Sequence, residues 1–482
     1  MRIPIALRLL AAASVLLLAA CGSFPKNPPL SKFDPGTGYR FQQIEPGNNS
    51  DELFVILTFS GGGTRAAALS YGVLEALRDT RIQWNSRTIS LLDEVDVISS
   101  ISGGSFPAAY YALYGSRLFE EFPGRFLYRP IQSDLLKLMF HPVSLAKLAG
   151  PSFGRSDLAA EFYDREVFGG GTYADVLARR RRPFVVLNAT DMTTGAQFPF
   201  VQDQFDLLCS DLAGVPLARA AAASSAFPGG LTPLTFQNYA GTCEYRQPAW
   251  VELAAADRKS RPNARRTARA ERRLGFTDAG VPRRYIHLTD GGVADNIGLR
   301  EPLTAITGVD NPWSVLRLIN EKKVNKLVVI VVNAATNPTT RRDQTSGVPG
   351  LVDTLTAAAD VPLDNYSFDT LELLRATARE FDEQKRLIDG CKTLAAAKGA
   401  QCALDIPAPH PFEFYQIEVA FEYLDDANER NWFKNLPTSL ELPAETVDKL
   451  RAIGRRILSE DQRFNELLKA LGGCLPAAGR SC

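Results

Sequence analysis

The chain has 482 residues, of which 45% are hydrophobic and 22% are charged, the composition of an ordinary soluble globular protein. Lys and Arg total 54, as do Asp and Glu, so the net charge gives no reason to expect a polyanionic partner. A chain of this length accommodates two domains or one large domain with additions.

A short apolar segment, LLAAASVLLLAA, opens the chain behind two arginines. It is too short to span a membrane comfortably, and its form predicts a signal peptide over residues 1–20. The segment ends in LAAC, which resembles the bacterial lipobox, so we expect Cys21 to become the first residue and to carry lipid. By the same resemblance, the lack of an acidic residue after Cys21 predicts sorting to the outer membrane. The alternative is an ordinary signal peptide with a chance cysteine.

Residues 21–50 are rich in Pro, Gly, Ser and Asn and show no periodicity, which predicts a flexible tether behind the anchor. The first core strand is predicted at 53–59, where the continuous apolar run LFVILTF is typical of a parallel strand covered on both faces. The next predicted strands are 95–102, 183–189, 284–290 and 326–334. Helical segments separate several of them, which predicts βαβ units and a mainly parallel sheet between helical layers.

The last third of the chain has a different character. Residues 351–388 have a helical pattern, 413–424 alternate like a strand, and the closing segment has the pattern of one or two helices. We therefore expect a core domain over 51–337 and a mostly helical extension over 338–482 that packs on it.

Two other segments have unusual composition. The basic run RKSRPNARRTARAERR, residues 258–273, is either a solvated loop or a surface attracted to anionic lipid headgroups. Nucleic-acid binding is not expected, because no aromatic residues interleave with its arginines. The segment LLKLMFHPVSLAKLAG, residues 135–150, is either an interfacial lid or a core helix that breaks before Pro142.

Six cysteines remain when Cys21 is set aside, and an even number in an exported chain predicts disulfides. Short loops close with the smallest loss of chain entropy, which favours bridges between sequence neighbours. No CxxC spacing occurs and the chain has only three histidines, so we expect no metal site. The predicted bridges are Cys209–Cys243, Cys391–Cys402 and Cys474–Cys482.

Three consecutive glycines, Gly61, Gly62 and Gly63, stand between the first strand and a predicted helix. Backbone N–H groups placed there converge on a negative charge, helped by the helix dipole, and Arg65 adds a positive charge. The stretch lacks both the GxxxxGK[ST] pattern of a phosphate loop and the third glycine of a dinucleotide loop.

The stretch SSISGGSFPAAYYA also leads from a strand into a helix. Ser105 follows Gly103 and Gly104 at the turn, where a nucleophile is lifted off the sheet. The alternative is a plain N-cap serine.

A third stretch, LTDGGVADNIG, places Asp290 at a strand end before two glycines. Its carboxylate is a candidate to accept the proton of a serine or to orient a base. The alternative is that Asp290 only forms an Asx-turn. The nearby Asp295 is a second candidate for that turn.

Together the three motifs resemble those of the patatin-like phospholipases, and the resemblance covers residues 53–333. With the lipobox and the long tail, the chain looks like a bacterial lipoprotein branch of that family. The resemblance implies a three-layer α/β/α fold and a patatin-like catalytic domain over 51–337. It implies no cofactor, a phospholipid or other lipid ester as substrate, and a membrane surface reached through the lipidated Cys21.

The resemblance also assigns roles to residues. It implies that Ser105 is the nucleophile and that Asp290 activates it without histidine. The implied oxyanion loop consists of Gly61, Gly62, Gly63 and Arg65. His287 lies on the opposite face of a regular strand from Asp290, which favours a structural role.

Pro107 departs from the family pattern, because it stands where the GxSxG elbow around Ser105 would have its last glycine. We expect a membrane-anchored serine lipid acyl hydrolase of the phospholipase A or lysophospholipase type. The alternatives are an acyltransferase that uses the same acyl-serine and a lipid-binding envelope protein that has lost turnover.

Overall fold

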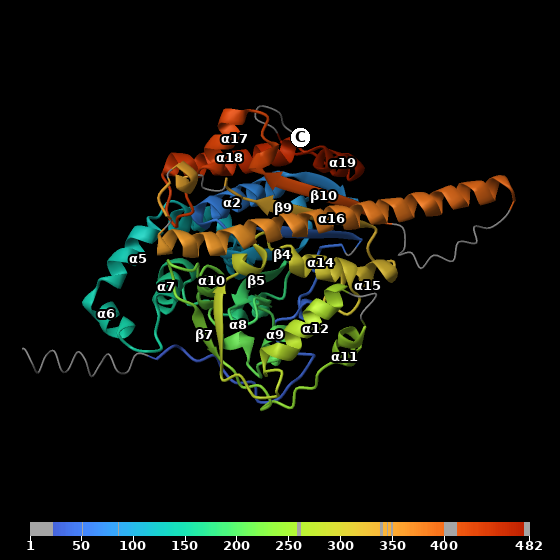
Figure 1. Cartoon of the computed structure of the whole chain (residues 1–482). Helices are drawn as coiled ribbons and strands as arrows, with labels where there is room; N and C mark the ends of the chain where they lie inside the picture. Colours follow the sequence, from blue (N-terminus) through green and yellow to red (C-terminus); the bar gives the residue numbers. More distant parts are fainter. Residues whose placement is uncertain are drawn as a thin grey trace, which may run out of the picture.

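A mixed sheet of eight strands runs through the middle of the protein, between layers of helices (Figure 1). The computed structural model describes residues 23–50, 52–84, 86–257, 262–337, 341–344, 346–348, 350–399 and 412–476. The predicted signal peptide and Cys21 lie outside the described residues. The layered α/β architecture with a mainly parallel sheet confirms the predicted fold class.

Parallel strands make up most of the sheet, whose order is β10-β9-β1-β4-β5-β8-β7, with β6 paired to β5. The mutually parallel strands are β1 (Leu53–Phe59), β4 (Val95–Ile101), β5 (Phe184–Asp191), β9 (Lys326–Asn333) and β10 (Glu413–Ala420). The antiparallel pairings involve β6 (Gln197–Pro199), β7 (Leu234–Gln237) and β8 (Tyr285–Asp290). A separate hairpin consists of β2 (Arg81–Trp84) and β3 (Arg87–Ser90). Strands β1 and β4 are buried along their whole length. The apolar run of β1 predicts this burial, whereas β4 also buries Asp96, Ser99 and Ser100.

Helices cover both faces of the sheet, with α17, α18 and α19 above it and α14 and α15 below it in the view of Figure 1. The helices up to the end of β7 are α2 (Gly63–Asp79), α3 (Ser105–Tyr114), α4 (Leu118–Phe122), α5 (Ile131–Met139), α6 (Pro142–Leu148), α7 (Arg155–Tyr163), α8 (Tyr173–Arg179), α9 (Gln202–Asp206) and α10 (Leu217–Ser224). Those that follow are α11 (Ala249–Ala256), α12 (Pro262–Leu274), α13 (Gly292–Asp295), α14 (Arg300–Thr307), α15 (Val315–Asn320), α16 (Leu351–Ala397), α17 (Ala427–Lys434), α18 (Ala444–Glu460) and α19 (Gln462–Ala470).

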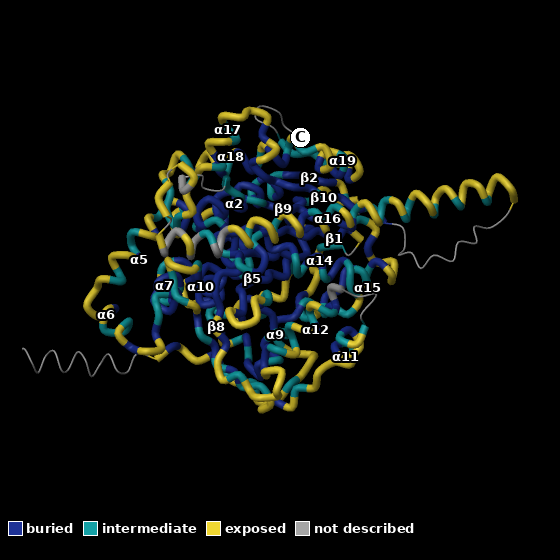
Figure 2. The backbone as a smooth tube through the Cα atoms, in the orientation of Figure 1, coloured by how far each residue is buried: buried dark blue, intermediate teal, exposed yellow. Residues whose placement is uncertain are grey.

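The C-terminal extension shares the core of the domain before it. Strand β10 extends the sheet by pairing with β9 along its full length. Helix α18 packs so closely on α2 that a Cβ atom at Gly72 would lie 2.3 Å from the backbone oxygen of Arg451. The Arg451 guanidinium also pairs with Glu75 at 2.9 Å. Figure 2 shows most of the buried residues in one interior, from which the far end of α16 projects with exposed residues.

The segment 135–150 forms the end of α5 and all of α6, a pair of helices that projects from the body (Figure 1). The helix breaks before Pro142, and Leu135 packs in the core. The core-helix alternative does not hold for the rest of the segment, because several of its apolar side chains face solvent. Phe140 is 73% exposed and Val143 is 60% exposed. Exposed apolar residues of this kind favour the interfacial alternative.

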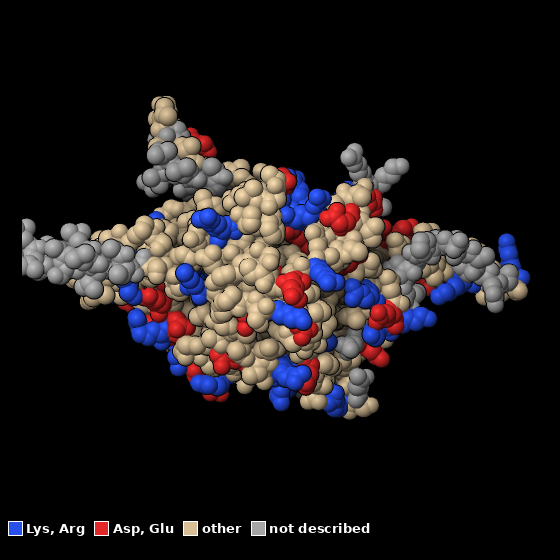
Figure 3. Space-filling view, turned by 90° about the horizontal axis from the view of Figure 1, so that it is seen from below, with Lys and Arg blue, Asp and Glu red and all other residues tan. Residues whose placement is uncertain are grey.

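The basic segment is helical where it is described, since α12 covers residues 262–274, so the loop alternative is wrong there. Viewed from below, positive and negative side chains are interspersed over the surface, without a field of one sign (Figure 3).

Cys209 and Cys243 form a disulfide with a Cα–Cα distance of 5.4 Å. The other two predicted bridges each include a residue outside the described part of the chain, Cys402 or Cys482, and stay predictions. Among the described helices, none combines the length and the apolar character that crossing a bilayer requires.

Candidate active site

The three glycine-containing motifs meet at one edge of the sheet, where β1, β4 and β8 end and α2, α3 and α13 begin. Carboxyl ends of neighbouring parallel strands lie at the same edge, which brings the turns after β1 and β4 together. A Cβ atom at Gly61 would lie 3.4 Å from the Cβ of Ser102. The glycine loop therefore lies against the turn that follows β4.

Ser102 is the serine that faces Asp290. Its Oγ donates a hydrogen bond to Asp290 Oδ2 at 2.9 Å. Ser105 is fully buried, and its Oγ lies 2.9 Å from Ser224 Oγ and 3.2 Å from Ser100 Oγ. The expectation that Ser105 pairs with Asp290 is therefore corrected, because the structure places Ser102 beside Asp290 instead. Ser102 is also only partly buried.

The backbone explains this placement. Strand β4 ends at Ile101, and Ser102 adopts a φ of 47°, a left-handed conformation that marks a tight turn. A Cβ atom at Gly103 would lie 2.0 Å from Gly63 O, and one at Gly104 would lie 2.7 Å from Ser60 O. Only glycine fits at these two positions, so the turn that both glycines permit is the one after Ser102.

With Ser102 at the elbow, the GxSxG pattern begins three residues earlier than predicted. Gly104 is then its last glycine, and Ser100 stands in place of the first. Pro107 falls outside the pattern, in the first turn of α3, where a missing N–H is tolerated. The signal that would have found Ser102 is the same pattern placed three residues earlier, at the predicted end of the strand.

Two residues that the sequence did not single out hold Ser102 in place. The Ser102 N–H donates to Ser224 Oγ at 2.8 Å, and Ser224 Oγ donates to the backbone oxygen of Asn188 at 2.7 Å. Ser224 is the last residue of α10 and is fully buried. Ser105 packs against this pair, so it contributes to holding the elbow.

Asp290 ends β8 and is 3% exposed. Its Oδ1 accepts the N–H of Gly292 at 2.7 Å, which leaves Oδ2 for Ser102. Burial raises the pKa of Asp290 to about 6, while these two hydrogen bonds oppose the shift. Asp290 thus forms the Asx-turn and also contacts the serine, so the two alternatives for this residue hold together.

The nearby Asp295 and His287 face other partners. Asp295 Oδ2 accepts the N–H of Arg300 at 2.7 Å. His287 is exposed, and its Nδ1 lies 3.0 Å from Thr235 Oγ1. Within the described residues, neither side chain hydrogen-bonds to Ser102 or Asp290, and Asp290 remains the candidate base.

The glycine loop opens α2 with a backbone conformation that residues with a side chain rarely adopt. Gly62 has a φ of 132° and Gly63 a φ of 59°. The N–H of Gly61 donates to Asn296 O at 2.9 Å. Within the described residues, the N–H groups of Gly62 and Gly63 donate to no protein acceptor. They stand at a helix N-terminus beside Ser102, where they are available to a developing negative charge.

Arg65 lies behind this loop. Its guanidinium donates to Ala334 O at 3.0 Å, to Leu436 O at 2.7 Å and to Thr438 Oγ1 at 3.2 Å. Burial lowers the pKa of Arg65 to about 10. The side chain therefore ties the glycine loop to the C-terminal extension, and its donors point at backbone and hydroxyl oxygens instead of at the space above Ser102.

Helix α16 passes over the aspartate turn. A Cβ atom at Gly292 would lie 3.0 Å from Leu363 Cδ1 and equally close to Asp290 Oδ1. One turn further along, Tyr366 lies under the Arg300 guanidinium at 5.1 Å. An apolar residue of α16 thus covers the turn that holds Asp290.

Comparison with known proteins places this geometry in a family. The sequence profile of the patatin-like phospholipases matches residues 57–303, which include all three motifs. None of the curated proteins compared with the chain matches it in sequence.

Solved structures show distant likeness. Human GIVD cytosolic phospholipase A2 is 12% identical with a TM-score of 0.43, and the match covers 88% of this chain. The chain spans 60% of the length of that human protein. VipD from Legionella pneumophila is 11% identical with a TM-score of 0.29, over 87% of this chain and 67% of VipD. Since the profile covers more than half of the sequence, the chain belongs to the patatin-like phospholipase family.

Proposed function

We propose that the protein is a serine lipid acyl hydrolase of the phospholipase A or lysophospholipase type, which uses Ser102 and Asp290 as its catalytic pair. The observation that carries the proposal is the 2.9 Å hydrogen bond between Ser102 Oγ and Asp290 Oδ2. The two amides of the adjacent glycine loop and the family membership support the same chemistry.

The proposed reaction begins with an ester carbonyl above Ser102. Asp290 accepts the hydroxyl proton while Ser102 Oγ attacks the carbonyl carbon. The N–H groups of Gly62 and Gly63 stabilise the oxyanion, and each such donor typically contributes ~10²–10³ in rate. When the intermediate collapses, Asp290 returns its proton to the leaving alcohol and the acyl chain stays on Ser102. Water, deprotonated by Asp290, then releases the fatty acid and restores the hydroxyl.

An activity-based probe tests the assignment. A fluorophosphonate forms a covalent bond only with an activated serine, so the wild-type protein should be labelled. Ser102→Ala should remove the labelling, and Ser105→Ala, which deletes the same hydroxyl three residues away, should retain it. Labelling that survives in Ser102→Ala and disappears in Ser105→Ala would restore Ser105 as the nucleophile.

The lipid-binding alternative without turnover rested on Pro107. Since Pro107 lies in the first turn of α3, outside the elbow around Ser102, that departure no longer argues against activity. The labelling experiment separates the two functions, because a scaffold protein would leave every serine unlabelled.

Membrane attachment is the second part of the proposal. The LAAC tetrapeptide supports a lipidated Cys21 and a location at the bacterial outer membrane. The first described residues enter the body on the side where α6 projects (Figure 1). An anchor there and the exposed apolar residues of α5 and α6 would face the same lipid surface. Cys21→Ser should release the protein from the membrane fraction, and an unchanged mass and fractionation would argue for a simple signal peptide.

A further inference from the structure

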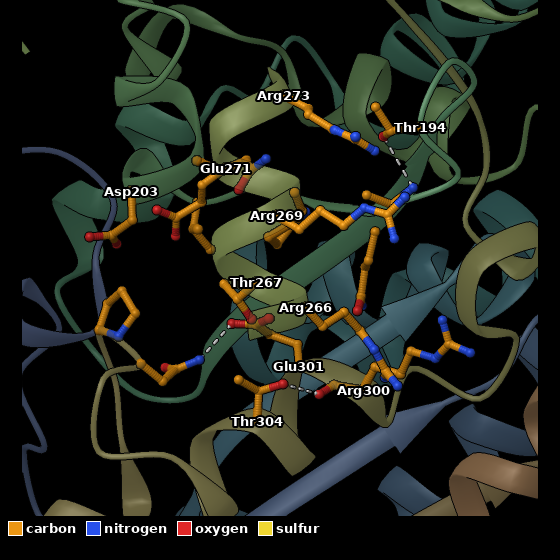
Figure 4. Close-up of a pocket in the computed structure, with 18 of the residues that line it drawn as sticks. Thr194, Asp203, Arg266, Thr267, Arg269, Glu271, Arg273, Arg300, Glu301 and Thr304 are labelled. Carbon is orange, nitrogen blue, oxygen red and sulfur yellow. Dashed lines mark hydrogen bonds between the residues drawn. The ribbon is translucent and has the colours of Figure 1, made fainter. Parts of the chain in front are cut away.

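A cavity of about 300 Å³ lies between α12, α14, α9 and the turn from Thr194 to Pro199 (Figure 4). Neither Ser102 nor Asp290 is among its lining residues. The cavity is built by the basic segment that the sequence singles out, since α12 supplies much of one side. Its volume suits a small ligand of low molecular weight.

One end of the cavity carries three arginines, two of which have no acidic partner among the described residues. Arg266 and Arg269 come from adjacent turns of α12, and Arg300 opens α14 (Figure 4). Among the described residues, no carboxylate forms an ion pair with Arg266 or Arg269. Burial, and then the charge of Arg300, lower the pKa of Arg266. Positive charges held together in this way favour a bound anion.

The other end of the cavity is acidic. Asp203 is neutralised by Arg40 at 2.7 Å, and Glu301 Oε1 accepts hydrogen bonds from Asn311 and Trp313. Glu271 has no ion pair within the described residues. Burial, and then the charges of Glu301 and Asp203, raise the pKa of Glu271 to about 8. A bound cation would relieve this unfavourable arrangement.

We propose that the cavity binds a small zwitterion, with a phosphate group against Arg266, Arg269 and Arg300 and an ammonium group against Glu271 and Glu301. Guanidinium groups match phosphate oxygens with paired N–H donors. An ammonium group donates to carboxylates. The arginines and the glutamates do not neutralise one another across the cavity, so the complementary ligand carries both charges. This chemistry belongs to aminoalkyl phosphates, either free or as a lipid headgroup.

Calorimetric titration of the full-length protein tests the proposal with glycerophosphoethanolamine as the probe. We expect it to bind at least about tenfold more tightly than glycerol 3-phosphate or ethanolamine, which each lack one of the two charges. Equal binding of glycerol 3-phosphate would identify a plain anion site and overturn the zwitterion proposal. Vesicles with and without phosphatidylethanolamine distinguish a headgroup from a free molecule.

Variants locate the binding. Arg266→Gln and Glu271→Gln should each weaken binding by about tenfold or more, because each removes the partner of one ligand charge. Arg272→Gln is the matched control, since Arg272 is on the same helix, is 52% exposed and lies outside the cavity. Unfolding temperatures of Arg266→Gln and Glu271→Gln near the wild-type value report that both variants are folded. Binding that both cavity variants retain, or no binding of any probe or vesicle by the wild-type protein, would overturn the proposal.

Discussion

Ser102 and Ser105 carry the same hydroxyl group three residues apart, but their surroundings give them different chemistry. Ser102 has an ionisable partner and a partly open position, whereas Ser105 is enclosed by other serines. A hydroxyl without a base nearby is a weak nucleophile at neutral pH. The backbone turn at Ser102 therefore decides which serine contacts Asp290.

Ser105→Ala is expected to affect stability more than chemistry. The substitution removes a buried hydroxyl that lies 2.9 Å from Ser224 Oγ, and a hydrogen bond of this kind contributes about 1 kcal/mol. The unfolding temperature should fall by about 1 °C in a chain of this length, while kcat for a soluble ester stays near the wild-type value. A loss of turnover without a change in unfolding temperature would contradict this role.

The pH dependence of turnover should report Asp290. Only the ionised carboxylate accepts the Ser102 proton, and burial raises the pKa of Asp290 to about 6. Because the pKa of this acid is raised, the active form is lost as pH falls through that value. We expect kcat/KM to be flat above pH ~7 and to fall about tenfold per unit below pH ~6. An acid limb near pH ~4, the ordinary range of an aspartic acid, would show that burial does not perturb Asp290.

At the scale of elements, α5 and α6 connect the exposed apolar surface to the glycine loop. Gln132, near the start of α5, accepts a hydrogen bond from Ser439 Oγ at 2.9 Å. The backbone oxygen of Ser439 accepts the N–H of Thr64 at 2.8 Å, one residue after the glycines. A lipid surface that meets these helices would lie close to the reaction site.

Replacing both exposed leucines of this helix pair should weaken vesicle binding. Leu136 and Leu145 are 48% and 49% exposed, and burying such side chains in lipid is favourable by about 1–3 kcal/mol each. We expect the double substitution to serine to reduce binding at least about tenfold in a vesicle sedimentation assay, measured on a Cys21→Ser background.

The matched control replaces Leu387 and Leu394 with serine. These leucines of α16 are 51% and 67% exposed. Their replacement removes two exposed apolar side chains of the same type from another surface. If both double variants lose binding equally, the exposed apolar area matters and the location does not. Turnover of a soluble ester should be unchanged in both.

The sequence predicted the central strands well, because β1 and the interior of β9 are apolar runs that are buried on both faces. Strand β4 is equally buried, although it includes an aspartate and two serines. It did not predict β6 or β7, which have three and four residues. Strands this short carry little periodicity, and their pairing is decided by contacts with distant segments.

The residues of the candidate site likewise fall into those that a local sequence pattern predicted and those that it did not. The glycine loop and Asp290 were found because glycine clusters after apolar runs are local signals. The sequence did not predict that Ser102, and not Ser105, contacts Asp290. The predicted strand continued to Ser102, whereas β4 ends at Ile101. Asn188 and Ser224 carry no local signal, since each acts through a backbone or side-chain contact that only the fold creates.

At the scale of the whole molecule, the reaction site depends on both ends of the chain. The glycine loop belongs to the first strand-to-helix turn, but its supports include Leu436 O and Ser439 O from the extension. A Cβ atom at Gly63 would lie 2.2 Å from Ser439 O. The extension thus forms the back wall of the loop, and movement of one would displace the other.

Arg65→Met should disturb both stability and turnover for this reason. The substitution keeps a long buried side chain but removes the donors to Ala334 O and Leu436 O. Each buried oxygen left without a partner costs about 1–3 kcal/mol, so the unfolding temperature should fall by several degrees. We also expect a lower kcat at temperatures well below the unfolding transition, where the variant is folded. The reason is that the amides of Gly62 and Gly63 lose the support that orients them.

Arg78→Met on the same helix is the control for Arg65→Met. Its side chain is 41% exposed and pairs with the neighbouring Asp79, an interaction that contributes little in water. This variant should match the wild type in both measurements. If Arg65→Met lowers the unfolding temperature but keeps the wild-type kcat, the loop holds its geometry without the extension. In that case the extension stabilises the fold and plays no part in orienting the oxyanion donors.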